Sequence, residues 1–234
     1  MILPSQISII IPTYNEVDNL PPLLGYIKEV APGVGEIIVV DSKGSSDGTL
    51  ESIKDDSVVQ VKSTHSSRAL QMQEGSKIAK GDVLYFLHAD TTPPRTFIND
   101  ILVSLEKGNE FGMFSYEFKS DSSLLKVNSK FTKRKGMFCG GGDQGLYILR
   151  STFNQIGGFN TELPIMEDFE LFWRLKDKKI PFEVIPSNAI VSARKYENNS
   201  YWKVNWVNMI TMIKFKKGVS PHKIKEFYTR KLQS

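Results

Sequence analysis

Acidic residues follow apolar runs at three places in this 234-residue chain, and carboxylates in such positions can hold a metal ion or accept a proton. Asp41 and Asp90 each close an apolar run, and Glu167 and Asp168 stand where a helical pattern begins. In open α/β sheets, ligands bind just beyond the carboxyl ends of strands. The sequence therefore predicts a ligand site that uses at least Asp90.

The run before Asp90 is apolar at consecutive positions and bounded by glycine and proline, which is typical of a strand buried on both faces. A carboxylate at its end can hold a hard divalent cation, and the cation can hold a phosphate. Taken singly, Asp41 and Asp168 are better explained as a turn former and a helix cap. Asp90 is harder to explain in this way, because Thr91 and Thr92 could supply the hydrogen bonds of a turn.

Strand and helix patterns alternate through the first hundred residues. Strands are expected at residues 7–11, 36–41, 58–61 and from 83, and helices at 20–27, 47–53, 68–80 and from Pro94 to about Lys107. Asp47 is the expected cap of the second helix. This order predicts an α/β fold with a mostly parallel central sheet flanked by helices.

The pattern is less regular after residue 110. Strands are expected at residues 111–118, 146–149, 182–185 and 189–191, and helices at 167–178 and from Pro221. Residues 119–135 are basic and interrupted. Residues 140–145 satisfy Gly-x-Gly-x-x-Gly, but no strand precedes them, so we reject a dinucleotide site there.

The composition is that of an ordinary globular protein, with 24% charged and 40% hydrophobic residues. A net charge of +4 suits phosphorylated ligands or an anionic membrane face, and we expect no nucleic-acid partner. The single cysteine, Cys139, excludes an internal disulfide and fits a reducing, cytoplasmic compartment. We expect neither a signal peptide nor a membrane-spanning helix, because no apolar run approaches the roughly 18 residues that a span needs.

Four motifs, in the right order, resemble the signatures of the family-two glycosyltransferases. The resemblance runs from about Ile7 to Arg174. The motifs are Pro12-Thr13-Tyr14-Asn15-Glu16, Val39-Val40-Asp41 with Ser45-Ser46-Asp47-Gly48-Thr49, Leu87-His88-Ala89-Asp90, and Gly157-Gly158-Phe159 with Met166-Glu167-Asp168-Phe169-Glu170-Leu171 and Arg174.

Further details look closest to a bacterial subgroup, the "transferase 2, rSAM/selenodomain-associated" proteins. They are His88-Ala89-Asp90, Ser67-Arg68-Ala69-Leu70-Gln71-Met72, Gly142-Asp143-Gln144-Gly145 and Ser192-Ala193-Arg194-Lys195-Tyr196. The resemblance implies a GT-A fold in a single domain over residues 1–234. Residues 1–110 would be the nucleotide-sugar-binding half, 111–198 the acceptor-side half and 199–234 a helical tail.

The resemblance also implies which residues meet the nucleotide-sugar donor. The loop after the first strand, with Asp41 and Ser42, would hold the base and ribose. Asp90 would bind Mg²⁺ or Mn²⁺ beside the donor diphosphate, and Arg68 and a basic residue of 133–135 are candidates for further phosphate contact. The donor-binding residues are Pro12, Thr13, Tyr14, Asn15, Glu16, Asp41, Ser42, Arg68, Ala89 and Asp90.

The family's catalytic base would be Asp168, with Glu167 as the alternative, because adjacent residues on one helical turn point differently. A base is needed because an acceptor hydroxyl must lose its proton as it attacks the anomeric carbon. One-step displacement predicts inversion at that carbon. Gly142, Asp143 and Gln144 would lie on the acceptor side. A Gln-x-x-Arg-Trp motif of processive synthases is absent from the sequence, which favours a single transfer per encounter.

Two positions depart from the family pattern. His88 replaces the first aspartate of the Asp-x-Asp motif, and it either ligates the metal or, as we favour, packs at the strand end. The second signature carries an extra residue, which leaves nucleotide contacts at Lys43 open. One alternative function is a non-catalytic nucleotide-sugar-binding protein, which is favoured if His88 marks a loss of metal binding. The other is a sugar-1-phosphate nucleotidyltransferase, which has a similar sheet but would need a glycine-rich, arginine-bearing loop after the first strand.

An apolar stripe near the C-terminus has helical spacing and basic neighbours. It could lie on an anionic membrane, which would suit a lipid-linked acceptor, but we favour a helix that packs the stripe into the core. The stripe is Trp202, Trp206, Met209, Ile210 and Ile213.

Overall fold

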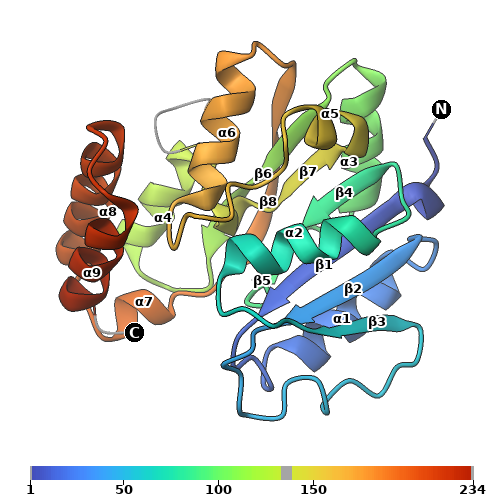
Figure 1. Ribbon diagram of the computed structural model, residues 1–234, viewed down its shortest axis with the longest axis horizontal. Coiled ribbons are helices and arrows are strands. Elements are labelled where there is room, and N and C mark those ends of the chain that lie inside the picture. Colours follow the sequence, from blue (N-terminus) through green and yellow to red (C-terminus); the bar gives the residue numbers. More distant parts are fainter. Residues whose placement is uncertain (1, 133–138, 233–234) are drawn as a thin grey trace.

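The computed structural model describes residues 2–132 and 139–232, and one mixed sheet runs through both segments. Its strands are β1 (Ile7–Thr13), β2 (Glu36–Asp41), β3 (Val58–Lys62), β4 (Val83–Phe86), β5 (Thr91–Thr92), β6 (Phe111–Phe118), β7 (Leu146–Leu149) and β8 (Phe182–Val191). Their order across the sheet is β3-β2-β1-β4-β7-β6-β8-β5 (Figure 1). The two halves of the chain therefore share a single sheet.

Parallel pairing is confined mainly to the first half of the chain. There, β1 pairs in parallel with β2 and β4, and β2 pairs in parallel with β3. In the second half, β7 is antiparallel to both β4 and β6, and β5 is antiparallel to β8, whereas β6 and β8 are parallel. The carboxyl ends of β1, β2 and β4 consequently point to the same edge of the sheet.

Helices cover both faces of this sheet (Figure 1). Those of the α/β body are α1 (Leu20–Val30), α2 (Arg68–Ile78), α3 (Phe97–Glu106), α4 (Ser123–Phe131), α5 (Arg150–Gln155) and α6 (Glu167–Asp177). Ile9 and Ile11 of β1 pack in a core cluster with α1 and α3, whereas Ile10 packs in a second cluster with α2, α5 and α6. This division follows from the alternation of side chains along a strand.

The helix α2 approaches the sheet closely because it carries Gly75. A Cβ at that position would lie 2.5 Å from the Ile10 side chain and 3.2 Å from that of Val40. The absence of a side chain thus allows α2 to rest directly on β1 and β2, with its first residue, Arg68, at the edge of the sheet that carries the strand ends.

Two local predictions are wrong, and one helix was not predicted. Residues 47–53 form turns instead of a helix, because the Asp47 carboxylate accepts hydrogen bonds from the backbone of Val17 and Thr49 and ties two loops together. The helix α4 lies in the basic segment, for which no element was predicted. The two expected short strands near residue 186 are one strand, β8, with a bulge where Pro186 cannot donate a backbone hydrogen bond.

The tail contains α7 (Arg194–Glu197), α8 (Tyr201–Lys216) and α9 (Pro221–Lys231), and α8 packs against α9. The core-packing interpretation of the apolar stripe is wrong. Trp202, Trp206, Met209 and Ile213 are exposed, and a different face of α8, which includes Val204 and Val207, is buried. Within residues 2–132 and 139–232, no helix is long and apolar enough to cross a membrane.

Candidate active site

The ends of β1, β2 and β3 are joined by the buried carboxylate of Asp41. Thr13 lies opposite Asp41 in the sheet and donates its hydroxyl to Asp41 Oδ1 over 2.8 Å. Lys62 Nζ lies 2.7 Å from Asp41 Oδ2. Both carboxylate oxygens of Asp41 thus have a partner within the protein, and Asp41 holds together the strand ends from which the neighbouring loops begin.

The loop after β1 interlocks with the loop after β2. Asn15 has a φ of 53°, its backbone N–H donates to Ser45 Oγ, and its side-chain oxygen accepts the backbone N–H of Ser46, both over 2.9 Å. The Glu16 backbone N–H donates to Thr49 Oγ1 over 2.9 Å. These bonds leave the ring of Tyr14 exposed at the surface of the paired loops. The structure therefore brings most of the predicted donor-binding residues together.

Asp90 lies beside Glu16, and one arginine joins the two side chains. Arg194 Nη2 is 2.9 Å from Asp90 Oδ2 and 3.1 Å from Glu16 Oε1. Arg194 begins α7, which follows β8, whereas Asp90 stands between β4 and β5. The site is thus completed by a residue from the C-terminal part of the chain.

A second acidic group lies at the start of α6. Glu167 and Asp168 are both buried there, and Arg68, at the start of α2, reaches both of them. Arg68 Nε lies 2.5 Å from Glu167 Oε1, and Arg68 Nη2 lies 3.5 Å from Asp168 Oδ2. Arg68 therefore connects the start of α2, in the first half of the chain, to the start of α6, in the second half.

The two adjacent carboxyl groups differ in their affinity for a proton. Burial raises the pKa of Asp168 to about 7; Arg68 opposes this rise, and the negative charges of Glu167 and Asp143 add to it. Burial also disfavours the charged form of Glu167, but the charge and hydrogen bond of Arg68, together with a backbone hydrogen bond, outweigh it and lower the pKa of Glu167. At neutral pH Glu167 is therefore an anion, whereas Asp168 can exchange a proton.

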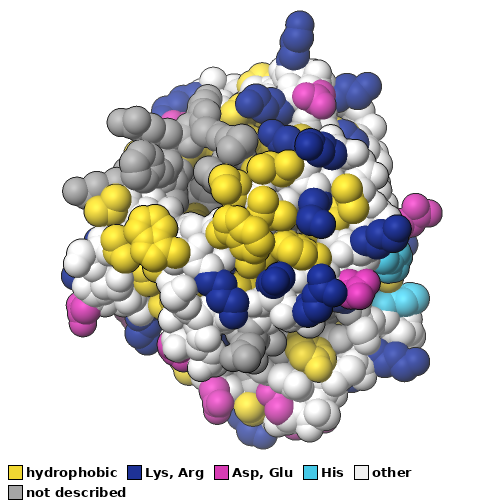
Figure 2. Space-filling model, turned by 90° about the vertical axis from the view of Figure 1, so that its left-hand side faces the viewer, with side chains coloured by type: hydrophobic (Ala, Val, Ile, Leu, Met, Phe, Trp, Pro, Cys, Tyr) yellow, Lys and Arg dark blue, Asp and Glu magenta, His cyan; other side chains and the backbone are white. Residues whose placement is uncertain are grey.

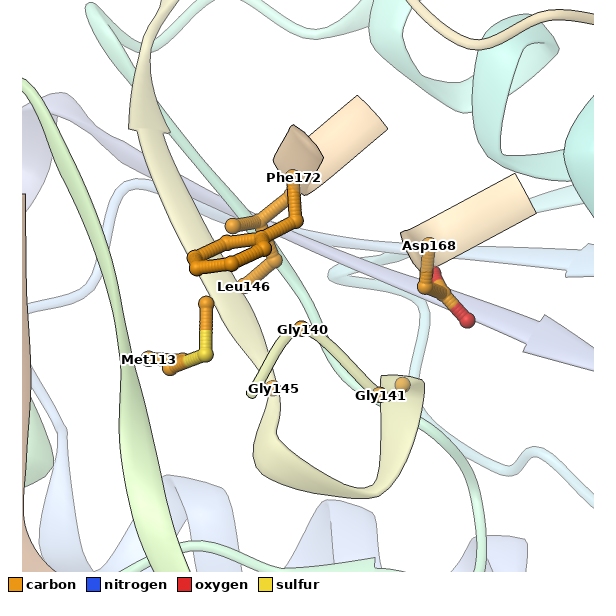
Figure 3. A pocket seen from close by; sticks show the side chains of 8 residues that line it. Met113, Gly140, Gly141, Gly145, Leu146, Asp168 and Phe172 are labelled. Atoms are coloured by element: carbon orange, nitrogen blue, oxygen red, sulfur yellow. The ribbon is translucent and has the colours of Figure 1, made fainter. Parts of the chain in front are cut away.

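The glycine-rich loop before β7 packs against His88 and Asp168. A Cβ on Gly142 would lie 2.2 Å from His88 Cε1 and 2.4 Å from Asp168 Oδ2, so only glycine fits. Figure 3 shows Asp168 and Phe172, both on α6, beside this loop in a small pocket. Asp143 Oδ1 lies 3.9 Å from His88 Nδ1. Burial and the charge of Arg68 lower the pKa of His88 to about 4, so its imidazole is neutral at pH 7.

The predicted acceptor-side residues have different environments. Asp143 is half exposed, while Gln144 is buried, accepts the backbone N–H of Gly140 over 2.9 Å and donates to the Phe114 carbonyl over 3.1 Å. Gln144 thus fixes the shape of the loop. The predicted phosphate contact from residues 133–135 lies outside the described residues.

Sequence reasoning assigned no role to Arg194 or Lys62. Arg194 is separated from Asp90 by 104 positions, and Lys62 from Asp41 by 21. Lys62, at the end of β3, stands out by no sequence pattern, whereas Arg194 lies in the motif Ser192-Ala193-Arg194-Lys195-Tyr196 that resembles the subgroup, a signal without a stated role. Only the order of the strands in the sheet shows that they meet these carboxylates.

The model of the family described as "Glycosyl transferase family 2" matches residues 8–163, about two thirds of the chain. The chain belongs to this family. The match covers all of the predicted donor-binding residues and ends just before the start of α6. The expected family and its α/β fold are confirmed.

Two curated relatives of this family-two glycosyltransferase are similar over about half of the chain. An undecaprenyl-phosphate 4-deoxy-4-formamido-L-arabinose transferase from Aeromonas hydrophila is 27% identical over 138 residues, which are 55% of this chain and 42% of the relative. A dolichol-phosphate mannosyltransferase from Pyrococcus furiosus is 30% identical over 115 residues, which are 47% of this chain and 33% of the relative. The matches thus span less than half of either relative.

A solved structure with the same fold is a mannosyltransferase from Pyrobaculum calidifontis in complex with GDP-Man and Mn²⁺. The TM-score is 0.71 with 18% sequence identity, and the similarity covers 92% of this chain and 64% of the other. The expected GT-A fold therefore extends over most of the chain, including parts of it that the family model does not match.

Proposed function

We propose that this family-two glycosyltransferase moves a sugar from a nucleotide-diphosphate donor to a hydroxyl group of a lipid-linked acceptor, with inversion at the anomeric carbon. The observation that carries the proposal is the pair of buried carboxyls at the start of α6, with Glu167 held as an anion by Arg68 and the pKa of Asp168 raised to about 7. A base that titrates near neutral pH combines the correct protonation state with the ability to accept a proton.

The donor would bind across the loops that follow β1, β2 and β4. The exposed ring of Tyr14 offers an apolar surface for the nucleotide base, and the backbone of the interlocked loops around Ser42 offers polar groups for the ribose. The side chain of Arg68 is 44% exposed, so a donor phosphate can reach its Nη groups while Nε remains paired with Glu167.

A divalent cation, Mg²⁺ or Mn²⁺, fits the chemistry of the residues beside Asp90. Two carboxylates, Asp90 and Glu16, share the single guanidinium of Arg194, so one negative charge remains uncompensated in this group. Carboxylate oxygens are hard ligands of the kind that Mg²⁺ and Mn²⁺ prefer. Over the described parts of the chain, no group of three or more His, Cys, Asp or Glu could hold a metal ion by itself. Asp90 would therefore hold the cation together with donor oxygens, and the bound cation would neutralise the departing diphosphate. His88 packs against the Gly142 loop, and we do not assign it as a ligand.

The acceptor is proposed from two observations. The curated relatives are named for undecaprenyl phosphate and dolichol phosphate, so a lipid-linked acceptor is a common feature of the proteins that this chain resembles. A phosphate acceptor is already ionised and needs no base, whereas a hydroxyl must lose a proton. The raised pKa of Asp168 therefore favours a hydroxyl as the attacking group.

The proposal is tested by incubating the protein with a panel of nucleotide-diphosphate sugars, Mn²⁺ and lipid-linked saccharides, and measuring nucleoside diphosphate release. We expect acceptor-dependent release and an inverted anomeric configuration in the product by NMR. Tight donor binding without release from any donor would favour the non-catalytic alternative. Pyrophosphate release from a nucleoside triphosphate and a sugar 1-phosphate would favour the nucleotidyltransferase.

A further inference from the structure

The helix α8 is apolar on two opposite sides, and the described parts of the chain cover only one of them. Val204, Val207 and Met212 are buried, and the first two pack in a cluster with Leu232. On the other side, four large apolar residues at positions i, i+4, i+7 and i+11 form one stripe, because this spacing returns to the same helical face. They are Trp202, Trp206, Met209 and Ile213, with 72%, 48%, 40% and 41% of their surface exposed.

The exposed stripe belongs to a well-anchored helix. Ser200 caps α8 by accepting the backbone N–H of Lys203. The rings of Trp206 and Phe227, on α8 and α9, are 6.3 Å apart, and Lys214 Nζ lies 4.6 Å from the centre of the Phe227 ring. The exposure of the stripe is therefore a property of the folded pair of helices.

The same region concentrates positive charge. Residues 201–232 contain seven lysines and one arginine but a single acidic residue, Glu226, whereas the whole chain has a net charge of only +4. The rest of the chain is consequently net negative. Figure 2 looks onto the side that α8 and α9 occupy in Figure 1 and shows hydrophobic side chains in its middle with Lys and Arg around them.

This face is connected to the candidate active site by a short segment. Arg194, which contacts Asp90 and Glu16, begins α7, and α8 begins seven residues later at Tyr201. Lys195 Nζ lies 5.8 Å from the centre of the Tyr228 ring on α9. The position of the α8–α9 pair is thus linked, through Arg194 and Lys195, to Asp90 and Glu16 in the candidate active site.

We propose that the α8 face, defined by Trp202, Trp206, Met209 and Ile213, docks on the surface of an anionic lipid bilayer. An apolar stripe with tryptophans and flanking lysines matches the boundary between acyl chains and negatively charged headgroups. A second copy of this chain is a poorer occupant, because two strongly basic faces would repel each other. The docked helix lies in the plane of the interface and brings the site to the membrane, which deepens the proposed function by placing a lipid-linked acceptor within reach.

The test is co-sedimentation of the full chain with vesicles, without donor or cation. One set is phosphatidylcholine alone, and the other contains about one third phosphatidylglycerol. We expect binding to the anionic vesicles that is weakened at high salt, since exposed charges are screened. Trp202→Ser together with Trp206→Ser should lower the partition coefficient by roughly tenfold or more. Met209→Ser together with Ile213→Ser, which leaves the Trp206–Phe227 contact intact, should lower it several-fold.

The matched control is Ile78→Ser together with Val103→Ser, which removes two apolar residues of similar exposure from α2 and α3. Its partition coefficient should equal that of the original chain. Equal binding to both vesicle types, no binding, or an equal loss in the control would overturn the inference. So would self-association in sedimentation velocity that the tryptophan variant abolishes. Because no donor is present, these outcomes are independent of sugar transfer.

Discussion

Asp168 and Glu167 are neighbours in the chain, yet their environments separate their roles. Arg68 lies 2.5 Å from Glu167 and 3.5 Å from Asp168, so the guanidinium compensates the charge of the first carboxyl more fully than that of the second. The resemblance to the family favoured Asp168 as the base but left Glu167 open. A carboxylate held as an anion by a cation is a poor proton acceptor, so the contacts of Arg68 support Asp168.

Replacement of the base should stop transfer without affecting donor binding. Asp168→Asn keeps the size of the side chain but cannot accept a proton, so we expect kcat to fall roughly 10²–10⁴-fold with donor affinity nearly unchanged. Asp177→Asn, at the exposed end of the same helix, is the control and should retain full activity. Full turnover by Asp168→Asn would show that Asp168 is not the catalytic base.

The rate should depend on pH through the same group. With the pKa of Asp168 raised to about 7, the carboxylate that accepts the proton accumulates as pH rises through 7, so kcat should rise between about pH 6 and 8. A pH profile of single-turnover transfer measures this. The rise of the rate between about pH 6 and 8 should be absent from the residual activity of Asp168→Asn. If the same rise remained in that variant, the titrating group would be a residue other than Asp168.

Stability should depend on pH in the opposite direction. Because the folded-state pKa of Asp168 lies above its unfolded value, its contribution to stability is present below about pH 4 and is lost as pH rises through about 7. Asp168→Asn does not titrate, so the Tm of this variant relative to the original should be higher at pH 8 than at pH 5. Thermal unfolding at the two pH values measures the difference.

At the scale of elements, Arg68 holds the start of α2 to the start of α6. Arg68→Ala would leave the buried charge of Glu167 without its partner, so we expect a loss of about 1–3 kcal/mol in the free energy of unfolding. The exposed pair of Arg95 and Glu29 provides the control, because Arg95→Ala should cost less than about 1 kcal/mol. Urea denaturation measures both losses. Equal losses in the free energy of unfolding would show that the buried Arg68–Glu167 pair contributes no more than an exposed ion pair.

The glycine loop before β7 should tolerate no side chain where it meets α6. Gly142→Ala places a methyl group against His88 and Asp168, so we expect transfer to fall about 10²-fold as the base is displaced. In Gly25→Ala, within α1, the new methyl group meets open space, and the variant should keep its activity and gain roughly 0.5–1 kcal/mol in stability. Steady-state assays and urea denaturation of both variants provide the comparison.

Elements with strong local patterns were predictable from the sequence, and those set by distant contacts were not. The buried β4 and the amphipathic α6 occur where their apolar patterns place them. The predicted helix after Asp47 is absent because its carboxylate bonds to Val17, a partner that no local pattern reveals. The predicted orientation of α8 was also wrong, because the sequence of a helix that is apolar on two sides does not show which side packs against the core.

For the whole molecule, the family motifs located the candidate site, and the sheet order explains how its parts meet. The loops proposed to bind the donor follow β1, β2 and β4, whereas Asp168 and Arg194 come from the second half of the chain. The motifs predicted Asp90 and Asp168 separately. The contacts of Arg68 and Arg194, which bind the halves together, depend on the three-dimensional arrangement and were not predicted.

Isothermal titration of the protein with a panel of nucleotide-diphosphate sugars, with and without Mn²⁺, compares the two proposed carboxylate roles in one assay. The original chain and Asp168→Asn should bind the same donor with similar affinity, and Mn²⁺ should strengthen both. Asp90→Asn should lose most of the strengthening by Mn²⁺, because a neutral amide binds a hard cation more weakly than a carboxylate does. Two results would contradict the proposed donor site at Asp90. One is that Mn²⁺ strengthens donor binding by Asp90→Asn as much as by the original chain. The other is that no form of the protein binds any donor.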